Sequence, residues 1–368
     1  MAKRATIVNT GIFFPRRRYS TMSFLSQLEN KLTSRRLPLI HDYLSPQPSH
    51  LLNLSLSSFL TTGAQPSSAD ETQCRLSSIS KPNRMPHGHH LVYFPPQVAS
   101  PQLLPDGCDV LHSPGAPFNR RMWAGGSVEF FEESGPLLNG QRAVCVEGIR
   151  DVNIKGKEGD EKIFVGIERR IATVGEQEGD DEIRSRLWTE SAEEQGDSIV
   201  IERRNLVFMR DRTAEEMEAV KVERASPRRP SKADTHYAVL LNPEFSHTLI
   251  PSRALLFRFS ALTFNAHSIH LDRDYARNTE GYDDLLVHGP LSLTIMLSLF
   301  QSYVSGLNQT VSSIQYRNLA PLLVEREMKL CASRKASGDS NTWDIWIEGN
   351  TGGLAVKGTV QTHSIDAH

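Results

Sequence analysis

The hydrophobic pattern is strongest in the second half of the chain. Residues 291–303 (LSLTIMLSLFQSY) are apolar over most of a helical circumference, and Gly289-Pro290 directly before them is a typical helix start. A helix that is apolar on nearly every side must be enclosed by other elements, so we expect a curved sheet to surround it. A second, shorter helix is predicted over residues 50–60, where apolar side chains recur at helical spacing.

Strand-like segments flank each of these helices. They are rich in β-branched and aromatic residues, and Gly, Asp or Asn stands at the joints between them, as expected for an antiparallel sheet. The predicted strands are residues 90–94, 121–131, 141–153, 162–174, 198–209, 252–263, 311–319, 327–334, 342–348 and 354–362. Because a helix followed by strands occurs twice, the sequence predicts an α+β protein made of two fused, related units.

Changes in composition indicate where the two units meet. Residues 211–235 lose the hydrophobic pattern and include the segment 227–230 (PRRP), which is typical of a linker. The predicted domains therefore cover residues 38–210 and 236–368. Within the first domain, residues 175–197 hold nine acidic residues, and we expect a solvated insertion between two strands there.

The N-terminus has a composition of its own. Residues 1–28 contain no acidic residue, while Lys3, Arg4 and three successive arginines at 16–18 are interspersed with Ser, Thr and Phe. A basic, hydroxyl-rich and acid-free start is typical of an organelle transit peptide. We therefore expect a mitochondrial presequence over residues 1–19 and a location in the mitochondrial matrix. A basic tail without a targeting function is the alternative.

Composition limits the classes of function. A formal net charge of −2 gives no reason to expect nucleic acid or an anionic membrane as the main partner. The longest apolar run, residues 291–303, is too short to span a bilayer. The four cysteines are scattered without a CxxC pair, which argues for a reducing compartment and against a disulfide framework or a zinc cluster.

The residues best suited to chemistry lie just before and at the start of the long helix. The segment 260–272 (SALTFNAHSIHLD) contains two imidazoles and one amide, and residues 288–290 (HGP) head the helix. The first turn of a helix has unpaired N–H groups and the positive end of the helix dipole. The sequence therefore predicts a functional site at the start of this buried helix.

These motifs carry a resemblance to a known family. Residues 260–272, with Tyr282 and residues 287–290 (VHGP), resemble the MaoC-type hot-dog hydratases and dehydratases. Within them, the resemblance is to the mitochondrial hydroxyacyl-thioester dehydratase type 2 group and to mesaconyl- and itaconyl-CoA hydratases. Residues 88–96 (GHHLVYFPP) and 111–126 (LHSPGAPFNRRMWAGG) are similar to the first half of that group. The resemblance implies a double hot-dog fold, acyl thioester substrates, and neither a metal nor another cofactor.

The resemblance also implies roles for individual residues. His270 stands at the position of the family's catalytic histidine, and a neutral imidazole can remove the C2 proton of a 3-hydroxyacyl thioester and return it to the leaving hydroxyl. The Gly289 N–H is the candidate donor to the thioester oxyanion. Asn265 stands where widespread hydratases have aspartate. Because an amide cannot exchange a proton, we expect it to hold the hydroxyl or water by hydrogen bonds.

Other residues allow two interpretations each. His288 is expected at the helix start, where it either packs or contacts the substrate. Arg120 and Arg121 are candidates to bind a substrate carboxylate, a CoA phosphate or an acidic carrier protein, or else they form a surface pair opposite the acidic segment. His267 lies off the family motif and is expected to be exposed or structural.

Three functions are consistent with these residues. The first is the reversible dehydration of (3R)-3-hydroxyacyl thioesters to trans-2-enoyl thioesters in mitochondrial type II fatty-acid synthesis, with acyl carrier protein as the carrier and CoA thioesters also accepted. The second is hydration of itaconyl- or mesaconyl-CoA, and the third is a non-catalytic acyl-thioester binder. The fused units predict a monomeric pseudo-dimer or a homodimer.

Two further site types are disfavoured. A metal site at the three histidines and Asp272 has no zinc-like spacing. A thioesterase would need a carboxylate in the site, and only Asp272 is close to the motif.

Overall fold

The computed structural model describes residues 21–60, 75–131, 135–157, 159–225, 242–335 and 340–365. The predicted presequence, residues 1–19, lies outside these ranges. Elements of the N-terminal half are α1 (Thr21–Thr33), β1 (Ile40–Tyr43), α2 (Pro46–Leu60), the 3₁₀ turns η1 (His89–Val92) and η2 (Ser100–Gln102), β2 (Arg120–Phe130), β3 (Arg142–Lys155), β4 (Lys162–Thr173), α4 (Asp180–Leu187), β5 (Val200–Met209) and α5 (Ala214–Ala225). Elements of the C-terminal half are β6 (Phe245–Leu249), α7 (Arg253–Leu262), the 3₁₀ turn η3 (Ser268–His270), α8 (Arg273–Asn278), α9 (Gly289–Ser305), β7 (Gln309–Asn318), β8 (Met328–Arg334), β9 (Thr342–Gly349) and β10 (Leu354–Ser364).

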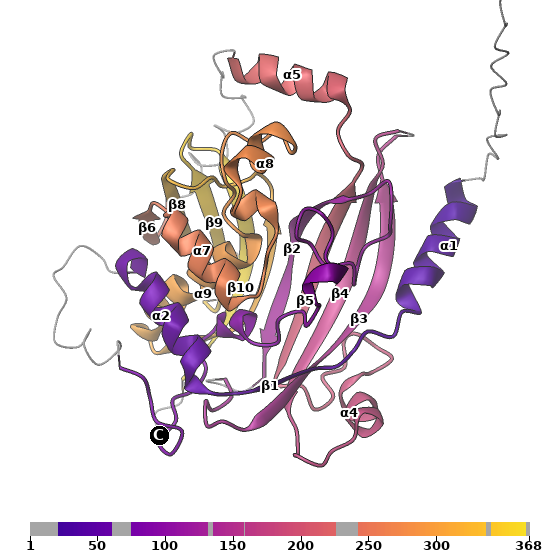
Figure 1. Ribbon diagram of the computed structural model, residues 1–368. Helices are drawn as coiled ribbons and strands as arrows, with labels where there is room; N and C mark the ends of the chain where they lie inside the picture. Colours follow the sequence, from indigo (N-terminus) through magenta and orange to yellow (C-terminus); the bar gives the residue numbers. More distant parts are fainter. Residues whose placement is uncertain are drawn as a thin grey trace, which may run out of the picture.

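The strands form one antiparallel sheet in which both halves share the same strand order (Figure 1). From one edge to the other, the order is β1-β3-β4-β5-β2-β7-β10-β9-β8-β6. Counted outwards from the centre, β2, β5, β4, β3 and β1 correspond to β7, β10, β9, β8 and β6, and β2 pairs directly with β7. The chain therefore contains two related five-stranded units joined edge to edge.

Helix α9 is the buried helix that the sequence predicts over residues 291–303, extended by two residues at each end. It packs on β7 and β2. Its side chains share one hydrophobic core with residues of the sheet such as Val311, Trp343 and Ile347. Each fully buried Leu, Ile or Phe of this kind contributes about 1.5–3 kcal/mol to the free energy of folding. The sheet thus forms round the helix because the helix is apolar on almost every side.

Eight of the ten predicted strands are confirmed, as β2–β5 and β7–β10, with boundaries that shift by at most two residues. The strand predicted over 252–263 is wrong, because these residues form α7. Leu255, Leu256 and Phe259 are buried at helical spacing, and the Ser252 hydroxyl caps the helix by accepting the N–H of Leu255 (3.2 Å). The N-cap and the helical spacing of the buried side chains favour a helix here more strongly than the alternation of apolar and polar residues favours a strand.

The strand predicted over 90–94 is also wrong, because its first residues belong to η1. All four residues of this turn are buried, so the segment shows no periodicity that separates helix from strand. Gly88 precedes the turn in the left-handed region, at φ 86°. A Cβ atom on Gly88 would lie 3.3 Å from the Cα atom of Thr294, so this turn packs tightly against α9.

The predicted helix over residues 50–60 is confirmed as α2, but it is not the central helix of its half. It packs against α7, α9 and η1, and its Leu52 and Leu56 enter the same core as α9. In the order of elements, α2 corresponds to α7. Within the described residues between α2 and β2, the N-terminal half has the 3₁₀ turns η1 and η2, whereas the C-terminal half has the long helix α9 before β7.

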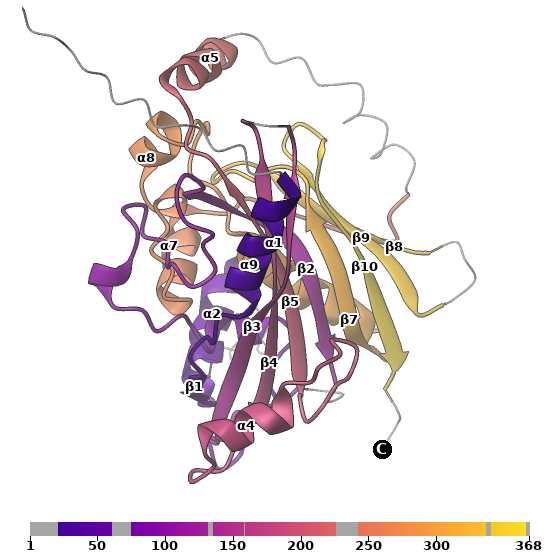
Figure 2. The same ribbon diagram turned by 90° about the vertical axis from the view of Figure 1, so that its right-hand side faces the viewer.

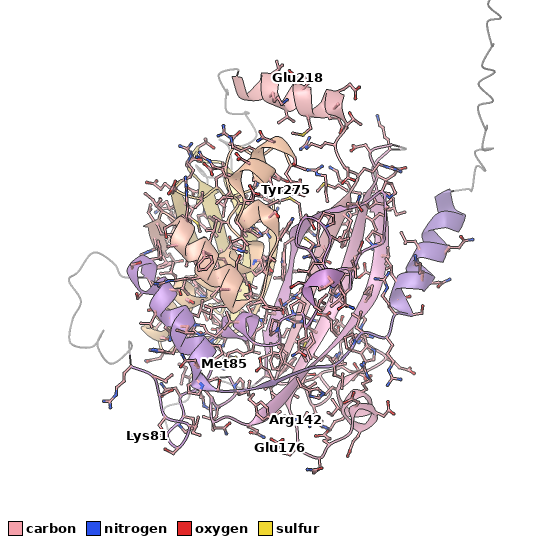
Figure 3. The ribbon with its side chains drawn as sticks, viewed as in Figure 1. Lys81, Met85, Arg142, Glu176, Glu218 and Tyr275 are labelled. Atoms are coloured by element: carbon pink, nitrogen blue, oxygen red, sulfur yellow. The ribbon has the colours of Figure 1, made fainter. Side chains whose placement is uncertain are left out.

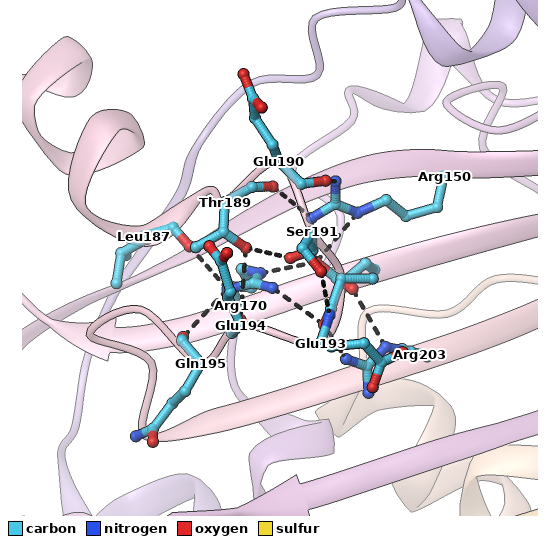
Figure 4. A network of polar contacts seen from close by, with 12 residues as sticks. Arg150, Arg170, Leu187, Thr189, Glu190, Ser191, Glu193, Glu194, Gln195 and Arg203 are labelled. Atoms are coloured by element: carbon cyan, nitrogen blue, oxygen red, sulfur yellow. Dashed lines mark hydrogen bonds and ion pairs between the residues drawn. The ribbon is translucent and has the colours of Figure 1, made fainter.

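The acidic segment 175–197 is an insertion between β4 and β5, as the sequence predicts, and eight of its nine acidic residues are exposed. Its helix α4 buries Ile183 and Leu187. Backbone carbonyls between residues 187 and 195 accept hydrogen bonds from three arginines that also share the buried carboxylate of Glu168. These arginines are Arg150, Arg170 and Arg203 (Figure 4). The guanidinium groups thus attach the segment to the sheet.

Two helices lie at the margins of the sheet. Helix α1 packs on β3 and adds Leu28 and Leu32 to a hydrophobic cluster of β3, β4 and β5 (Figure 2). Helix α5 lies within the segment predicted as a linker, the rest of which, from residue 226 on, is outside the described residues. None of the helices in the described ranges combines the length and hydrophobicity needed to cross a lipid bilayer.

The two units meet at β2 and β7, where two glycines allow the strands to approach closely. Gly125 pairs with Arg317, and Gly126 pairs with Tyr316. A Cβ atom on Gly125 would lie 2.3 Å from the carbonyl oxygen of Tyr316, and one on Gly126 would lie 1.9 Å from that of Arg203. Because both neighbours are backbone atoms of paired strands, no larger residue fits without a shift of the sheet.

We expect Gly126→Ala to lower the free energy of unfolding by about 3 kcal/mol, since overpacking against backbone forces β2 away from β5. Urea unfolding followed by circular dichroism measures this change. Gly179→Ala is the matched control, because Gly179 has φ −81° and no atom lies within 4 Å of the place where the added methyl group would stand. The control should change the free energy by less than about 1 kcal/mol. Equal unfolding midpoints for the two variants would contradict the prediction.

Candidate active site

A cavity of about 1050 Å³ lies between the two halves of the molecule. Both halves contribute to its walls, and five of the six predicted site residues line it. These are His270, Asn265, Gly289, Arg120 and Arg121. The sixth, His288, lies directly behind the wall. The fold thus brings together residues that are about 150 positions apart in the sequence.

His270, at the end of η3, is buried and neutral. Its Nδ1–H donates a hydrogen bond to the carbonyl oxygen of Leu286 (2.8 Å), so Nε2 carries the lone pair. Burial lowers the pKa of His270 to about 4, the hydrogen bond to Leu286 opposes this shift, and the charge of Arg121 adds to it. At pH 7 the ring can therefore act as a base through Nε2.

His288 supports His270 from behind. The two rings stack with centroids 3.7 Å apart and an angle of 23° between their planes. Nε2 of His288 lies 2.8 Å from the Ser260 hydroxyl, and burial lowers the pKa of His288 well below its ordinary value. As the N-cap of α9, His288 thus links the helix start to α7 and fixes the plane of the His270 ring.

Helix α9 begins at Gly289, whose N–H is one of the first-turn groups that have no acceptor within the helix. A Cβ atom on Gly289 would lie 2.9 Å from Nδ2 of Asn318 and 3.0 Å from Cβ of Trp123. Glycine is needed here because the helix start touches the junction of β2 and β7. Gly289 lines the cavity, so the positive end of the helix dipole lies at the cavity wall.

Asn265 lies in a turn that its side-chain oxygen helps to stabilise by a hydrogen bond. Its Oδ1 accepts the backbone N–H of His267 (3.0 Å), and its own N–H donates to the carbonyl oxygen of Ser260 (2.8 Å). The side-chain NH₂ group of Asn265 can therefore donate to a ligand, and Oδ1 keeps one lone pair.

Arg120 and Arg121 form buried ion pairs in the cavity wall. Nε of Arg120 lies 2.7 Å from the Glu280 carboxylate, whose other oxygen accepts from Tyr275. Figure 3 labels Tyr275 on α8. Nη1 of Arg121 lies 2.9 Å from the Asp109 carboxylate. The two arginine side chains are only 10% and 16% exposed, which excludes a surface pair.

His267 is buried and lines the cavity, contrary to an exposed position. Its Nε2 lies 3.5 Å from the Asp106 carboxylate. Among the described residues, one group offers metal ligands in reach of each other, with one atom each from Asp106, Cys108 and His267 within 4.8 Å. Asp272 stands apart from it, because this carboxylate caps α8 and is exposed. The four residues that the sequence offered as metal ligands are therefore not assembled into one group.

Comparison with known proteins agrees with this geometry. A sequence model of the family described as hydroxyacyl-thioester dehydratase type 2 matches residues 88–324. The mitochondrial hydroxyacyl-thioester dehydratase type 2 of Schizosaccharomyces pombe is 26% identical over 322 residues, which cover 84% of this chain and 92% of the relative. Mesaconyl-C(4)-CoA hydratase of Chloroflexus aurantiacus is 31% identical over 275 residues, which cover 74% of this chain and 81% of the relative. The chain belongs to the hydroxyacyl-thioester dehydratase type 2 family.

A solved structure supports the fold of this family member. A MaoC-like dehydratase from Phytophthora capsici matches with a TM-score of 0.56 at 12% identity, covering 91% of this chain and 97% of that structure. The predicted double hot-dog fold is thereby confirmed. The names of the relatives describe the removal or addition of water, so the prediction of a hydro-lyase enzyme is confirmed as well.

Sequence reasoning missed two side chains and one carbonyl that hold the site together. Ser260 was part of the motif, but nothing in the spacing indicated its contact with His288. The Leu286 carbonyl sets the tautomer of His270, and a backbone acceptor leaves no signal in the sequence. Asp106 lies far from His267 along the chain, and only the turn signal of an Asp-Gly pair marked that loop.

The lowered pKa of His270 predicts a specific pH dependence. Because the base must be neutral to work and its pKa is about 4, we expect kcat/KM to stay constant from pH 7 down to about pH 5 and to fall as pH drops through 4. Initial rates of enoyl-thioester hydration across this range test the prediction. A second assay at pH 7 after exposure to acid shows whether the enzyme was reversibly protonated or irreversibly unfolded. An inflection of kcat/KM near pH 6.5 would contradict the prediction.

Proposed function

We propose that this protein catalyses the reversible dehydration of (3R)-3-hydroxyacyl thioesters to trans-2-enoyl thioesters. The observation that carries the proposal is the state of His270. It is a buried, neutral imidazole whose Nδ1 is bound to the Leu286 carbonyl, which leaves a basic Nε2 in a cavity headed by the start of α9. Membership of the family supports the same reaction.

The reaction needs a base for the C2 proton and a donor for the oxyanion that develops on the thioester oxygen. Nε2 of His270 removes the proton and returns it to the leaving hydroxyl as an acid. The N–H of Gly289, at the positive end of α9, stabilises the oxyanion. The NH₂ group of Asn265 donates to the oxygen of the hydroxyl or water, while its Oδ1 accepts the backbone N–H of His267.

His270→Gln should lower kcat for crotonyl-CoA hydration by about 10²–10⁴-fold, because an amide cannot carry the proton. Loss of the enoyl-thioester absorbance measures the rate. His50→Gln in α2 is the matched control, since His50 does not line the cavity, and it should keep wild-type activity. Hydration at the wild-type rate in His270→Gln would rule out the assignment. An inactive wild type that still binds acyl thioesters would support the non-catalytic binder.

A second candidate is hydration of a dicarboxylic substrate such as mesaconyl-C4-CoA. Six guanidinium groups line the cavity and could attract a second carboxylate. They belong to Arg120, Arg121, Arg169, Arg204, Arg210 and Arg212. The first five contact a carboxylate of the protein, and Arg212 donates to the backbone carbonyl of Glu280 (3.1 Å). Because pairing neutralises five of the six arginines, we favour monocarboxylic enoyl substrates over the reaction named for the Chloroflexus aurantiacus relative.

The ratio of kcat/KM values for the two substrate classes tests this choice. We expect crotonyl-CoA and longer trans-2-enoyl-CoA to be hydrated at least about tenfold more efficiently than mesaconyl-C4-CoA, because an extra charge must be desolvated beside paired arginines. The reverse order would favour the dicarboxylic substrate. The same assay with enoyl groups on acyl carrier protein instead of CoA identifies the carrier.

We also propose that the protein works in mitochondria, in type II fatty-acid synthesis with acyl carrier protein. The basic, acid-free composition of residues 1–28 supports this location, as does the mitochondrial name of the Schizosaccharomyces pombe relative. Cell fractionation of the protein with and without residues 1–19 checks it. Loss of the mitochondrial fraction is expected on deletion, and an unchanged distribution would contradict the presequence.

A further inference from the structure

A loop of the N-terminal half docks on the loop that carries His270. The backbone carbonyl of Asp106 accepts the N–H of Ser268 (2.8 Å). Next to it, Gly107 lies in the left-handed region at φ 83°, and a Cβ atom there would lie 2.0 Å from the carbonyl oxygen of Ala266. The two backbones therefore touch where only glycine fits, and this contact holds Asp106 beside the catalytic loop.

Asp106 and His267 form a buried carboxylate–imidazole pair. Oδ2 of Asp106 lies 3.5 Å from Nε2 of His267, and the two residues are 7% and 5% exposed. Oδ1 accepts the N–H of Cys108 (2.9 Å), which fixes the orientation of the carboxylate. A carboxylate at this distance favours the tautomer of His267 with its proton on Nε2, which leaves Nδ1 as an acceptor.

His267 lies beside His270 in the cavity, with the two rings edge to face and their centroids 5.5 Å apart. A substrate whose C2 proton reaches His270 brings its C3 hydroxyl to the same place, where the hydroxyl hydrogen needs an acceptor. Oδ1 of Asn265 already accepts the backbone N–H of His267 (3.0 Å), which leaves one lone pair on that oxygen. The imidazole of His267 is a second neutral acceptor, and it stands directly beside His270.

We propose that His267 is a second catalytic residue, which accepts the hydrogen of the substrate's C3 hydroxyl through Nδ1, and that Asp106 is a positioning residue that fixes its tautomer. The inference rests on the proposed dehydration and extends it. The residues that act on the substrate then come from the C-terminal half, while the N-terminal half supplies the carboxylate behind them.

The protons balance in this arrangement. Nε2 of His270 takes the C2 proton, the electron pair of the C2–H bond forms the C2=C3 double bond, and the C3–O bond breaks. The leaving oxygen keeps its own hydrogen, which forms a hydrogen bond to Nδ1 of His267. The same oxygen receives a second hydrogen by proton transfer from Nε2 of His270. Water leaves, both imidazoles are neutral again, and no further reactant is needed. In hydration, the same contact orients the attacking water.

A divalent cation is the competing occupant of this cluster, since Sγ of Cys108 is the third atom of the group within 4.8 Å. The charge of Arg121 favours the carboxylate–imidazole pair, because its guanidinium group lies 2.9 Å from Asp109, acts on the Cys108 thiol and would repel a cation.

Asp106→Asn tests the positioning role, because asparagine keeps the shape but can donate to Nε2 of His267 and shift the proton to Nδ1. We expect kcat for crotonyl-CoA hydration to fall about 10- to 100-fold and KM to change less than about twofold, with an unchanged melting temperature as evidence of folding. The ¹⁵N chemical shifts of the His267 ring, assigned by comparison with His267→Gln, should change from the Nε2–H to the Nδ1–H tautomer.

The double variant Asp106→Asn/His267→Gln completes the test. If the two residues act as a unit, it loses no more activity than His267→Gln alone. Two results would overturn the proposed Asp106–His267 pair and leave the dehydratase function intact. The first is additive losses of activity in the double variant. The second is wild-type kcat in Asp106→Asn while His270→Gln is inactive. A wild type without hydratase activity would instead overturn the proposed function and, with it, the role of His267.

Cys108→Ser separates the pair from a metal site. Serine keeps the size of the buried side chain and removes the thiolate ligand, so activity should stay within about twofold of wild type. Loss of activity in this variant, together with about one equivalent of metal in the purified wild-type protein by plasma mass spectrometry, would show a cation at the cluster and overturn the inference.

Discussion

The close pairing of β2 with β7 is the constraint on which the rest of the structure depends. Gly125 lets β2 approach β7, which joins the halves into one sheet, and Gly126 lets β2 approach β5 on its other side. Directly beyond the paired residues, Asn318 donates to the carbonyl oxygen of Trp123 (2.9 Å), and Gly289 rests against both side chains. The position of the α9 start, and hence of Gly289 at the cavity wall, therefore follows from the geometry of the junction.

Burial then determines which chemistry the site can perform. Low polarity around His270 and His288 lowers the pKa of both, so the stacked imidazoles are neutral and do not repel each other. The same low polarity strengthens the attraction between the dipole of α9 and a developing oxyanion. Ion pairs such as Arg121–Asp109 keep charge in the wall without leaving it unpaired. A neutral base and a charged transition state can thus share one cavity.

The sequence predicts what depends on local pattern and not what depends on contacts between loops. The long helix and eight strands repeat their hydrophobic spacing over many residues, whereas η1 is a single buried turn with no period to detect. His270, Asn265 and Gly289 lie within one short stretch, so a motif could bring them together. The contact between Asp106 and His267 joins loops of opposite halves, and it depends on the fit of Gly107 against a backbone carbonyl, which no spacing encodes.

The two halves share a strand order but differ in their chemistry, and the difference begins at η1. One 3₁₀ turn has neither the aligned peptide dipoles nor the row of free N–H groups that α9 offers at Gly289. The chain between η1 and β2, residues 93–119, instead extends to the other half, where its Asp106 lies beside His267, while its Asp109 pairs with Arg121 of its own half. The N-terminal half thus forms part of the cavity wall, while His270, Asn265 and Gly289 stand on the C-terminal half. In two identical units, the segment that leads into the central strand would have to contain a long helix and also contact the site of the other unit. In the fused chain, the two halves differ in sequence, so each segment has one of these roles.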